Sequence, residues 1–205
     1  WGGANPNPAL LRLAPALQLS LRGASCIYQG DELGLPEADI AFEDLQDPYG
    51  ITMWPDFKGP HGRRTPFPWD STAPDLGFGG AAKNAKPWLP ISEKQRPLAA
   101  NAQEADAGAL LHHYRHLLQW RRKHPALLQG DLTLLPKHEQ VVAYVRGHGG
   151  ERVLCAFNMT AARATLTLSG DTVAAVLSDS GATGAAAQGA AITFEPYGVL
   201  FARLA

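Results

Sequence analysis

The feature that most constrains this sequence is a long stretch, from residue 30 to about residue 105, whose apolar residues follow neither a helical nor a strand period. Loops of this length are usually functional or disordered. Large aromatic side chains argue against disorder here because they bury much surface, and the stretch contains Phe42, Trp54, Phe57, Phe67, Trp69, Phe78 and Trp88. We therefore expect an ordered, packed loop region between regular elements.

A helix and a strand are expected before this loop. Asn7 can cap a helix over residues 8 to 22, with Pro8 in its first turn, and Pro15 should kink it because proline removes one amide donor. After Gly23, the β-leaning run over residues 24–28 predicts a buried strand. A helix that leads through a glycine turn into such a strand is the unit of a parallel α/β fold.

After the loop, the pattern predicts one strong helix and then a β domain. The helix starts at Asp106 and is closed by Pro125. Seven short strands, separated by turn residues, predict an antiparallel sandwich; they span residues 132–135, 141–145, 153–157, 164–168, 173–177, 190–194 and 199–202. The alanine-rich tract 182–191 is expected to be a loose loop, and the domain boundary falls near residues 124–130.

Composition excludes several classes of partner. The 205 residues carry 18 basic and 19 acidic side chains, a formal charge of −1, so there is no excess of positive charge for nucleic acid or an anionic membrane surface. No apolar run approaches the length of about 20 residues that spans a bilayer. The only cysteines, Cys26 and Cys155, each lie in an apolar run, which predicts two buried free thiols and a cytoplasmic protein.

Two groups of polar residues have structural explanations. Asp31 and Glu32 follow the predicted strand, where barrel enzymes carry catalytic carboxylates, but adjacent residues of an extended chain point in opposite directions. His112, His113 and His116 include a pair at helical spacing, without a Glu or Cys ligand at a recognised distance. We favour local structural roles for the carboxylates and a solvated helix face for the histidines, and we expect no metal and no cofactor.

The run Arg63-Arg64-Thr65-Pro66-Phe67-Pro68-Trp69-Asp70 has a functional interpretation. A guanidinium offers paired donors to hydroxyl groups, and aromatic rings suit the apolar face of a sugar. The run therefore suggests a carbohydrate ligand, with a packed surface loop as the alternative.

The order of five segments resembles glycoside hydrolase family 13, the α-amylase family, and within it the α-glucosidase and oligo-1,6-glucosidase branch. These segments are Leu19-Ser-Leu-Arg-Gly23, Ile27-Tyr-Gln-Gly-Asp-Glu-Leu-Gly34, Arg64-Thr-Pro-Phe-Pro-Trp69, Tyr114-Arg-His-Leu-Leu-Gln-Trp-Arg-Arg122 with Pro125-Ala-Leu127, and a β-rich tail with Phe157-Asn158. Asp31 stands where the family commonly has Glu, and Phe67 where it commonly has Met.

The resemblance implies the C-terminal part of a larger enzyme. Residues 1–124 resemble the last portion of a (β/α)8 barrel, with its last strand, long loop and last helix, and residues 125–205 resemble the C-terminal β-sandwich. The nucleophilic Asp, the acid/base Glu and the third Asp of the family all lie upstream of the first match, so no catalytic residue is expected in this chain. The Arg of the Arg-Thr-Pro match, Arg64, is implied to hold the terminal glucose.

We therefore expect the C-terminal segment of a retaining exo-α-glucosidase that hydrolyses or transfers terminal α-linked glucose of short oligosaccharides. Its expected partners are a small α-glucoside and the missing N-terminal barrel portion of the same protein. The candidates around the acceptor subsite are Phe42, Glu43, Asp44 and Trp54. The alternatives are a transglucosylase, a sucrose or maltose isomerase, and a non-catalytic glycan- or partner-binding module; the five sandwich aromatics, Tyr144, Phe157, Phe194, Tyr197 and Phe201, favour a core over a glycan-binding face.

Overall fold

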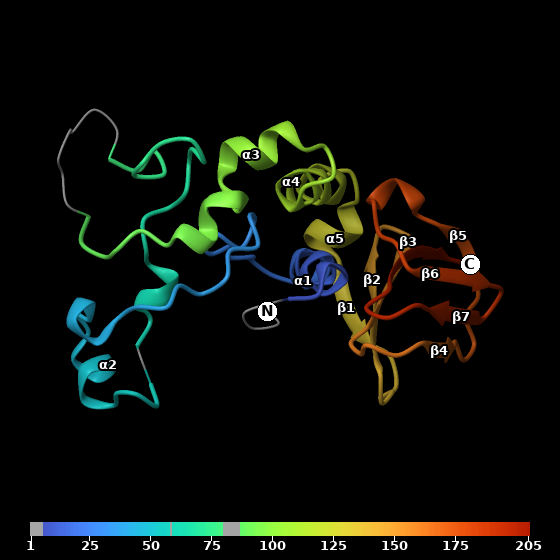
Figure 1. The fold of residues 1–205 in the computed structure, drawn as a ribbon. Coiled ribbons are helices and arrows are strands. Elements are labelled where there is room, and N and C mark those ends of the chain that lie inside the picture. Colours follow the sequence, from blue (N-terminus) through green and yellow to red (C-terminus); the bar gives the residue numbers. More distant parts are fainter. Residues whose placement is uncertain (1–5, 58, 80–86) are drawn as a thin grey trace. The chain divides into compact units, whose positions relative to one another are not determined.

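The computed structural model describes residues 6–57, 59–79 and 87–205 (Figure 1). These residues form two compact units. The first, here called the helix–sandwich unit, comprises residues 6–26 and 113–205, and the second, the loop unit, comprises residues 27–112. The predicted boundary near residues 124–130 stays a prediction.

The first expected helix is present as α1 (Pro8–Ser20). Asn7 caps it as predicted, because its side chain accepts a hydrogen bond from the amide of Ala9 at 2.9 Å. Pro15 lies inside the helix and is buried. The second expected helix is α4 (Leu110–Arg121), which begins four residues after Asp106 because the Asp106 carboxylate accepts the amide of Gly108 and forms a turn there.

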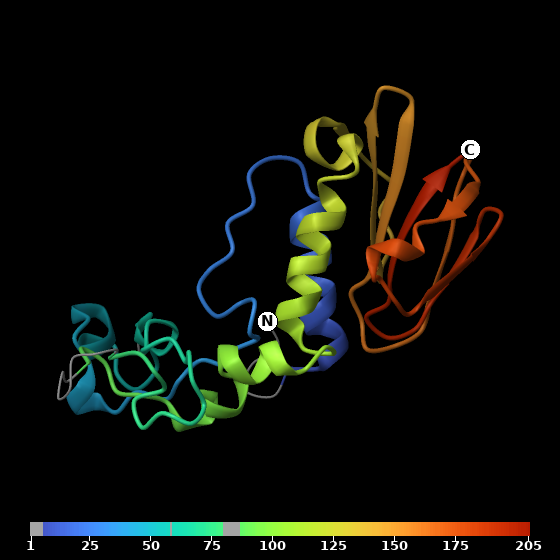
Figure 2. The ribbon, with the colours of Figure 1, turned by 90° about the horizontal axis from the view of Figure 1, so that it is seen from above.

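Helices α1 and α4 lie side by side in both ribbon views (Figures 1 and 2). Within the helix–sandwich unit, the ring of His113 contacts the carbonyl oxygen of Arg12 at 3.1 Å and joins the two helices. A short helix, α5 (Pro125–Gln129), follows α4 and packs against the first long strands.

All seven expected strands are present, and together with one more they form two antiparallel sheets. The five-stranded sheet has the order β1 (Asp131–Leu134), β2 (Val141–His148), β3 (Glu151–Asn158), β8 (Val199–Leu204) and β5 (Val173–Val176). The three-stranded sheet has the order β4 (Ala164–Thr167), β7 (Ala191–Phe194) and β6 (Ala185–Gln188).

The unexpected strand is β6, which lies in the alanine-rich tract that we expected to be a loose loop. Alanine has a low strand propensity, but β6 pairs with β7 over four positions, from Ala185 opposite Phe194 to Gln188 opposite Ala191. Pairing with an amphipathic neighbour outweighs the weak local preference. The expectation of a loose loop over residues 182–191 was therefore wrong.

The central strands are buried on both faces. On β3, Leu154 and Ala156 belong to the core between the two sheets, whereas Cys155 and Phe157 point to the opposite face. That opposite face packs against the helices: the Tyr144 hydroxyl lies 2.7 Å from the Ser20 hydroxyl of α1. Both faces of the five-stranded sheet are thus covered at its central strand β3.

The loop unit contains no strand among its described residues, as the missing period predicts. Its regular elements are short: η1 (Phe42–Asp44), α2 (Pro48–Thr52), η2 (His61–Arg63), η3 (Glu93–Leu98) and α3 (Ala100–Ala105). A small core of Ala38, Ile40 and Leu45, with Trp54 packed against it, supports one part of it. The expectation of an ordered loop region is confirmed for these parts.

Two expectations for residues 24–28 were wrong. The segment forms no strand, and its Cys26 is exposed, whereas Cys155 is buried as expected. A strand exists only where neighbouring backbone accepts and donates its hydrogen bonds, and no described residue forms a ladder with this segment. Without such a neighbour, a segment whose residues favour strands remains an irregular, partly exposed connection.

Candidate functional site

Arg64 lies directly after the short helix η2 in the loop unit. Its amide donates to the carbonyl of His61 at 2.9 Å, which ends the helix. The Arg64 side chain is exposed, and its guanidinium has no hydrogen-bond or ion-pair partner among the described residues. Such an exposed planar fork is available for a ligand's hydroxyl or carboxylate oxygens.

The neighbouring arginine is already paired. Arg63 Nε lies 3.6 Å from Glu37 Oε1, and both side chains are more than half exposed, at 68% and 51%. An exposed pair of this kind contributes little to stability, but it holds Arg63 toward Glu37. The structure thus separates the two arginines that the sequence places side by side.

The residues that follow Arg64 are stiff and buried. Thr65 and Pro66 are both buried, and Pro66 biases Thr65 toward an extended conformation. Farther along, the rings of Phe67 and Trp69 lie with their centroids 4.6 Å apart, and Trp69 is 56% exposed. The run from Arg63 to Asp70 therefore presents a cation and an exposed indole, as a carbohydrate interpretation requires.

The four acceptor candidates come from two neighbouring elements. Phe42, Glu43 and Asp44 form the helix η1, and Trp54 follows α2. The structure brings Phe42 and Trp54 together, since their ring centroids lie 5.6 Å apart in an edge-to-face arrangement. In the described part of the chain, Glu43 and Asp44 form no ion pair with Arg64, so this group stays a separate candidate.

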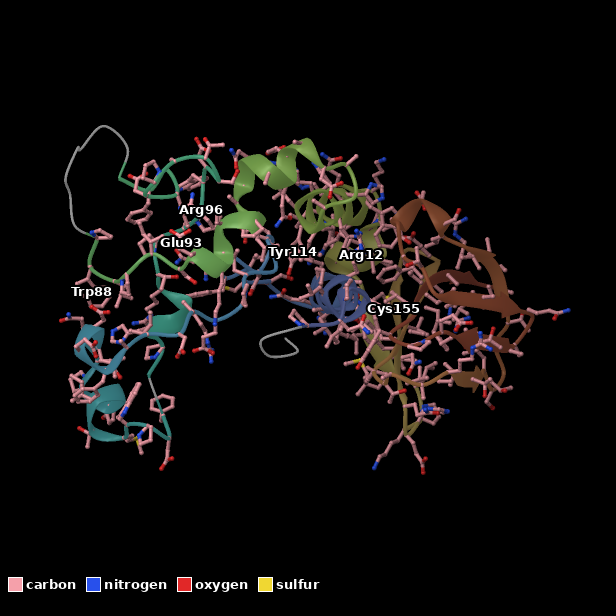
Figure 3. All side chains as sticks on the ribbon, in the orientation of Figure 1. Arg12, Trp88, Glu93, Arg96, Tyr114 and Cys155 are labelled. Atoms are coloured by element: carbon pink, nitrogen blue, oxygen red, sulfur yellow. The ribbon has the colours of Figure 1, made fainter. Side chains whose placement is uncertain are left out.

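Sequence reasoning missed two residues of this region, His61 and Trp88. Their rings contact each other edge to face at 5.3 Å; His61 is buried and its Nδ1 has no partner among the described atoms, whereas Trp88 is 62% exposed. Figure 3 labels Trp88 on the loop unit. Their separation of 27 positions hid the pair, because no local period connects residues so far apart.

The loop after Trp69 is held by Arg96, which lies beside Glu93 in Figure 3. The guanidinium of Arg96 donates to both Glu93 oxygens, at 2.6 and 2.9 Å, and to the carbonyls of Ser71 and Ala73 at 2.8 Å. These hydrogen bonds from Arg96 lower the pKa of the Glu93 carboxyl. Arg96 thus stabilises the loop through the backbone carbonyls of Ser71 and Ala73.

Asp31 and Glu32 have the local roles that we favoured. The Asp31 carboxylate accepts the amide of Tyr28 at 3.0 Å, and that of Glu32 accepts the amide of Gly30 at 2.9 Å. Both carboxylates therefore stabilise the turn that they belong to. The structure assigns them no partnership as acid and base.

The three histidines of α4 contact three different parts of the chain. His112 contacts the carbonyl of Glu104, and His116 contacts that of Asp179 at 2.7 Å, whereas His113 is buried against α1. The expected solvated face is therefore wrong for His113. No group of three metal-ligating side chains occurs among the described residues.

Comparisons with known proteins agree with this architecture. Residues 5–130 match the family described as "Alpha amylase, catalytic domain", and residues 132–200 match "Maltogenic Amylase, C-terminal domain". A probable alpha-glucosidase of Rhizobium meliloti (strain 1021) is 47% identical over 166 residues, which cover 81% of this chain and 29% of that protein. The chain thus spans less than a third of that relative's length.

Two solved structures are similar over nearly the whole chain. The crystal structure of an alpha-glucosyl transfer enzyme, XgtA, is 43% identical with a TM-score of 0.90, over 99% of this chain and 37% of that one. The trehalulose synthase MutB of Pseudomonas mesoacidophila MX-45 is 26% identical with a TM-score of 0.80, over 98% of this chain and 40% of that one. The fold is accordingly the C-terminal end of a (β/α)8 barrel followed by an antiparallel β-sandwich, and this chain belongs to the α-amylase family.

Proposed function

We propose that this chain is the C-terminal segment of a retaining exo-α-glucosidase, which releases or transfers terminal α-linked glucose from short oligosaccharides. The observation that carries the proposal is the exposed Arg64 guanidinium, which has no partner among the described residues and lies in a segment that matches the α-amylase catalytic domain. The similarity to a probable alpha-glucosidase supports it.

The proposed chemistry divides the work between this chain and the rest of the protein. In retaining hydrolysis, one carboxylate attacks the anomeric carbon while a carboxylic acid about 5 Å away protonates the leaving oxygen. Those groups belong to the upstream part of the family's barrel. In this chain Arg64 would donate paired hydrogen bonds to the terminal glucose. Such a clamp closes the substrate pocket beyond that glucose, so that an oligosaccharide cannot extend past it.

The proposed acceptor subsite consists of Phe42, Glu43, Asp44 and Trp54. The edge-to-face pair of Phe42 and Trp54 offers an apolar surface to a sugar ring. The two carboxylates of η1 offer acceptors to its hydroxyl groups.

Glucosyl transfer to an acceptor other than water is the second candidate. The similarity to an alpha-glucosyl transfer enzyme and to a trehalulose synthase favours it. A non-catalytic glycan-binding module is less well supported, because four of the sandwich aromatics, Tyr144, Phe157, Phe194 and Phe201, are at most 2% exposed. Those rings form core and offer no binding face.

The test is product analysis with the full-length protein that contains this chain. Maltose, isomaltose and sucrose are supplied separately, and glucose, transfer products and isomers are quantified. Glucose release with retained α-configuration supports the glucosidase, and isomers or longer products support transfer. If none of the three sugars is consumed while the sandwich binds glycan, the non-catalytic alternative replaces the proposal.

We also propose a cytoplasmic location. Both cysteines are free, and Cys26 is exposed, a state that a reducing compartment preserves. None of the helices among the described residues is long and apolar enough to cross a membrane. Cell fractionation with an antibody against this chain tests the location.

A further inference from the structure

The side chain of Gln95 in η3 is almost completely buried, with 3% of it exposed, although it carries a polar amide. Both ends of that amide are used within the loop unit. Its Oε1 accepts a hydrogen bond from the hydroxyl of Thr65 at 3.3 Å, and its Nε2 donates to the carbonyl of Pro36 at 3.0 Å. Gln95 therefore bridges two segments that are about 30 residues apart in sequence.

These two segments also touch each other directly. The amide of Ala38 donates to the carbonyl of Gly62 at 2.8 Å. A Cβ atom at Gly62 would lie 2.5 Å from the Ala38 oxygen and 2.5 Å from Glu37 Cγ, so only glycine allows this approach. The backbone of Arg64 is thus held by contacts two residues before it and one residue after it.

We infer that Gln95 is the positioning residue of Arg64, through the hydrogen bond that anchors Thr65. This inference rests on the proposed role of Arg64 as the clamp on the terminal glucose. The Arg64 side chain has no partner of its own among the described residues, so its orientation depends on how firmly its backbone is held. A prearranged backbone reduces the entropy that is lost when the guanidinium binds a ligand.

The chemistry of the position explains why a neutral amide is needed. Thr65 requires an acceptor and Pro36 requires a donor, and glutamine supplies both on one side chain. Methionine has a similar length and volume but no amide, so Gln95→Met removes both hydrogen bonds with little change in packing. Thr65→Val removes one of the same bonds from the other side.

The first experiment is independent of the proposed function. Trypsin cleaves after Arg63 and Arg64 only when this turn opens locally, and mass spectrometry follows each cut. In full-length protein, Gln95→Met and Thr65→Val should each speed these cuts about tenfold, which corresponds to about 1.4 kcal/mol of lost local stability. Cleavage after Arg122, in the helix–sandwich unit, should stay unchanged.

Gln119→Met is the matched control, since Gln119 is an exposed residue of α4. It should leave the cuts after Arg63 and Arg64 at the wild-type rate. Unchanged cleavage in both Gln95→Met and Thr65→Val overturns the inference. So does an equal acceleration at Arg122, because that result shows global destabilisation instead of a local anchor.

The second experiment is a double-mutant cycle on kcat/KM for maltose. Gln95→Met should lower kcat/KM about tenfold in the wild-type background but less than twofold in the Arg64→Lys background, because its effect passes through Arg64. Equal losses in both backgrounds overturn the inference. If the wild-type protein hydrolyses no α-glucoside, the proposed function fails, and the proteolysis experiment still decides whether Gln95 anchors the turn.

Discussion

At the scale of single residues, the contrast between Arg63 and Arg64 matters most. Arg63 lies 3.6 Å from Glu37, whereas Arg64 has no partner among the described residues. An arginine that is already paired loses that pair when it binds a ligand. An unpaired one on a stiff segment has no such cost, which supports the proposal that Arg64, and not Arg63, is the clamp.

Replacement of Arg64 by lysine in the full-length protein should lower kcat/KM for maltose by about one to two decades. The physical reason is that the ammonium of lysine cannot reproduce the planar, paired N–H donors of a guanidinium. A charge-assisted contact of this kind contributes about 1.5 to 3 kcal/mol. Arg63→Lys is the matched control and should stay within about twofold, since its exposed pair contributes little. If Arg64→Lys changes kcat/KM by less than about twofold while Arg63→Lys lowers it by about one to two decades, the clamp is Arg63.

The two thiols should differ sharply in reactivity in this 205-residue chain. Cys26 is exposed and should react at once with a disulfide reagent such as dithionitrobenzoate, whereas Cys155 is buried and should react only after unfolding. Burial also raises the pKa of the Cys155 thiol, which leaves little of the nucleophilic thiolate. The kinetics of labelling with and without urea measure this difference, and rapid reaction of Cys155 in the native chain contradicts it.

At the scale of elements, the buried guanidinium of Arg146 connects α1, α5 and β1. Arg146 of β2 is completely buried, and its guanidinium donates to the carbonyls of Ser20, Gly130 and Asp131. Ser20 is the last residue of α1 and Gly130 caps α5, so the cation lies at two helix C-termini, where the dipoles favour positive charge. The backbone carbonyls replace the carboxylate that a buried arginine usually has.

Arg146→Met should destabilise the helix–sandwich unit by about 3 kcal/mol, because three backbone carbonyls lose the Arg146 donor, and two of these hydrogen bonds are buried. The free energy of unfolding in urea measures this loss. Arg122→Met, at an exposed position of the same unit, serves as control and should change the stability by less than about 0.5 kcal/mol. Equal stabilities of the two variants would show that the Arg146 hydrogen bonds add nothing net.

The contact between α1 and α4 should make stability depend on pH. Burial lowers the pKa of His113, although its hydrogen bond to the Arg12 carbonyl acts in the opposite direction. The unfolded chain then takes up a proton more readily than the folded chain. Stability from this group is therefore present above the unfolded pKa of about 6.5 and is lost as the pH falls below it.

His113→Gln keeps a donor for the Arg12 carbonyl but cannot titrate. Its unfolding free energy should fall less steeply between pH 7 and pH 5 than that of the wild type, by up to about 1.4 kcal/mol per pH unit. Urea titrations at several pH values give the two slopes. Parallel slopes would show that His113 titrates alike in the folded and unfolded states.

At the scale of the whole molecule, residues 24–28 lack the strand neighbours that the sequence led us to expect. They lie within the region that matches the family's catalytic domain, but they form no ladder with any described residue. A parallel barrel strand is stable only with neighbours on both sides. The match to the Rhizobium meliloti protein covers 29% of that protein's length.

The isolated 205-residue chain should therefore have no glycosidase activity. Under the proposed function, the paired carboxylates of retaining hydrolysis lie in the upstream part of the family's barrel, and a segment without strand partners favours aggregation. Release of nitrophenol from an aryl α-glucoside is the measurement, with the full-length protein as positive control. Turnover by the purified chain would place a catalytic pair within these residues and contradict the proposal.

The sequence by itself determined the elements whose period is local. The capped helix α1, the apolar face of α4 and seven sandwich strands follow from the spacing of side chains within each segment. These features are predictable because each residue's environment repeats every two or every 3.6 positions. The motif Arg64-Thr65-Pro66 was likewise visible, because its residues are consecutive.

Only the tertiary structure decided the features that depend on distant partners. It placed β6 against β7 despite its alanines, left residues 24–28 without a ladder, and exposed Cys26. It also paired Arg63 with Glu37 and connected Gln95 to Thr65, across 26 and 30 positions of chain. Hydrogen-bond partners and burial are set by whichever segments meet in space, and no local period records which segments those are.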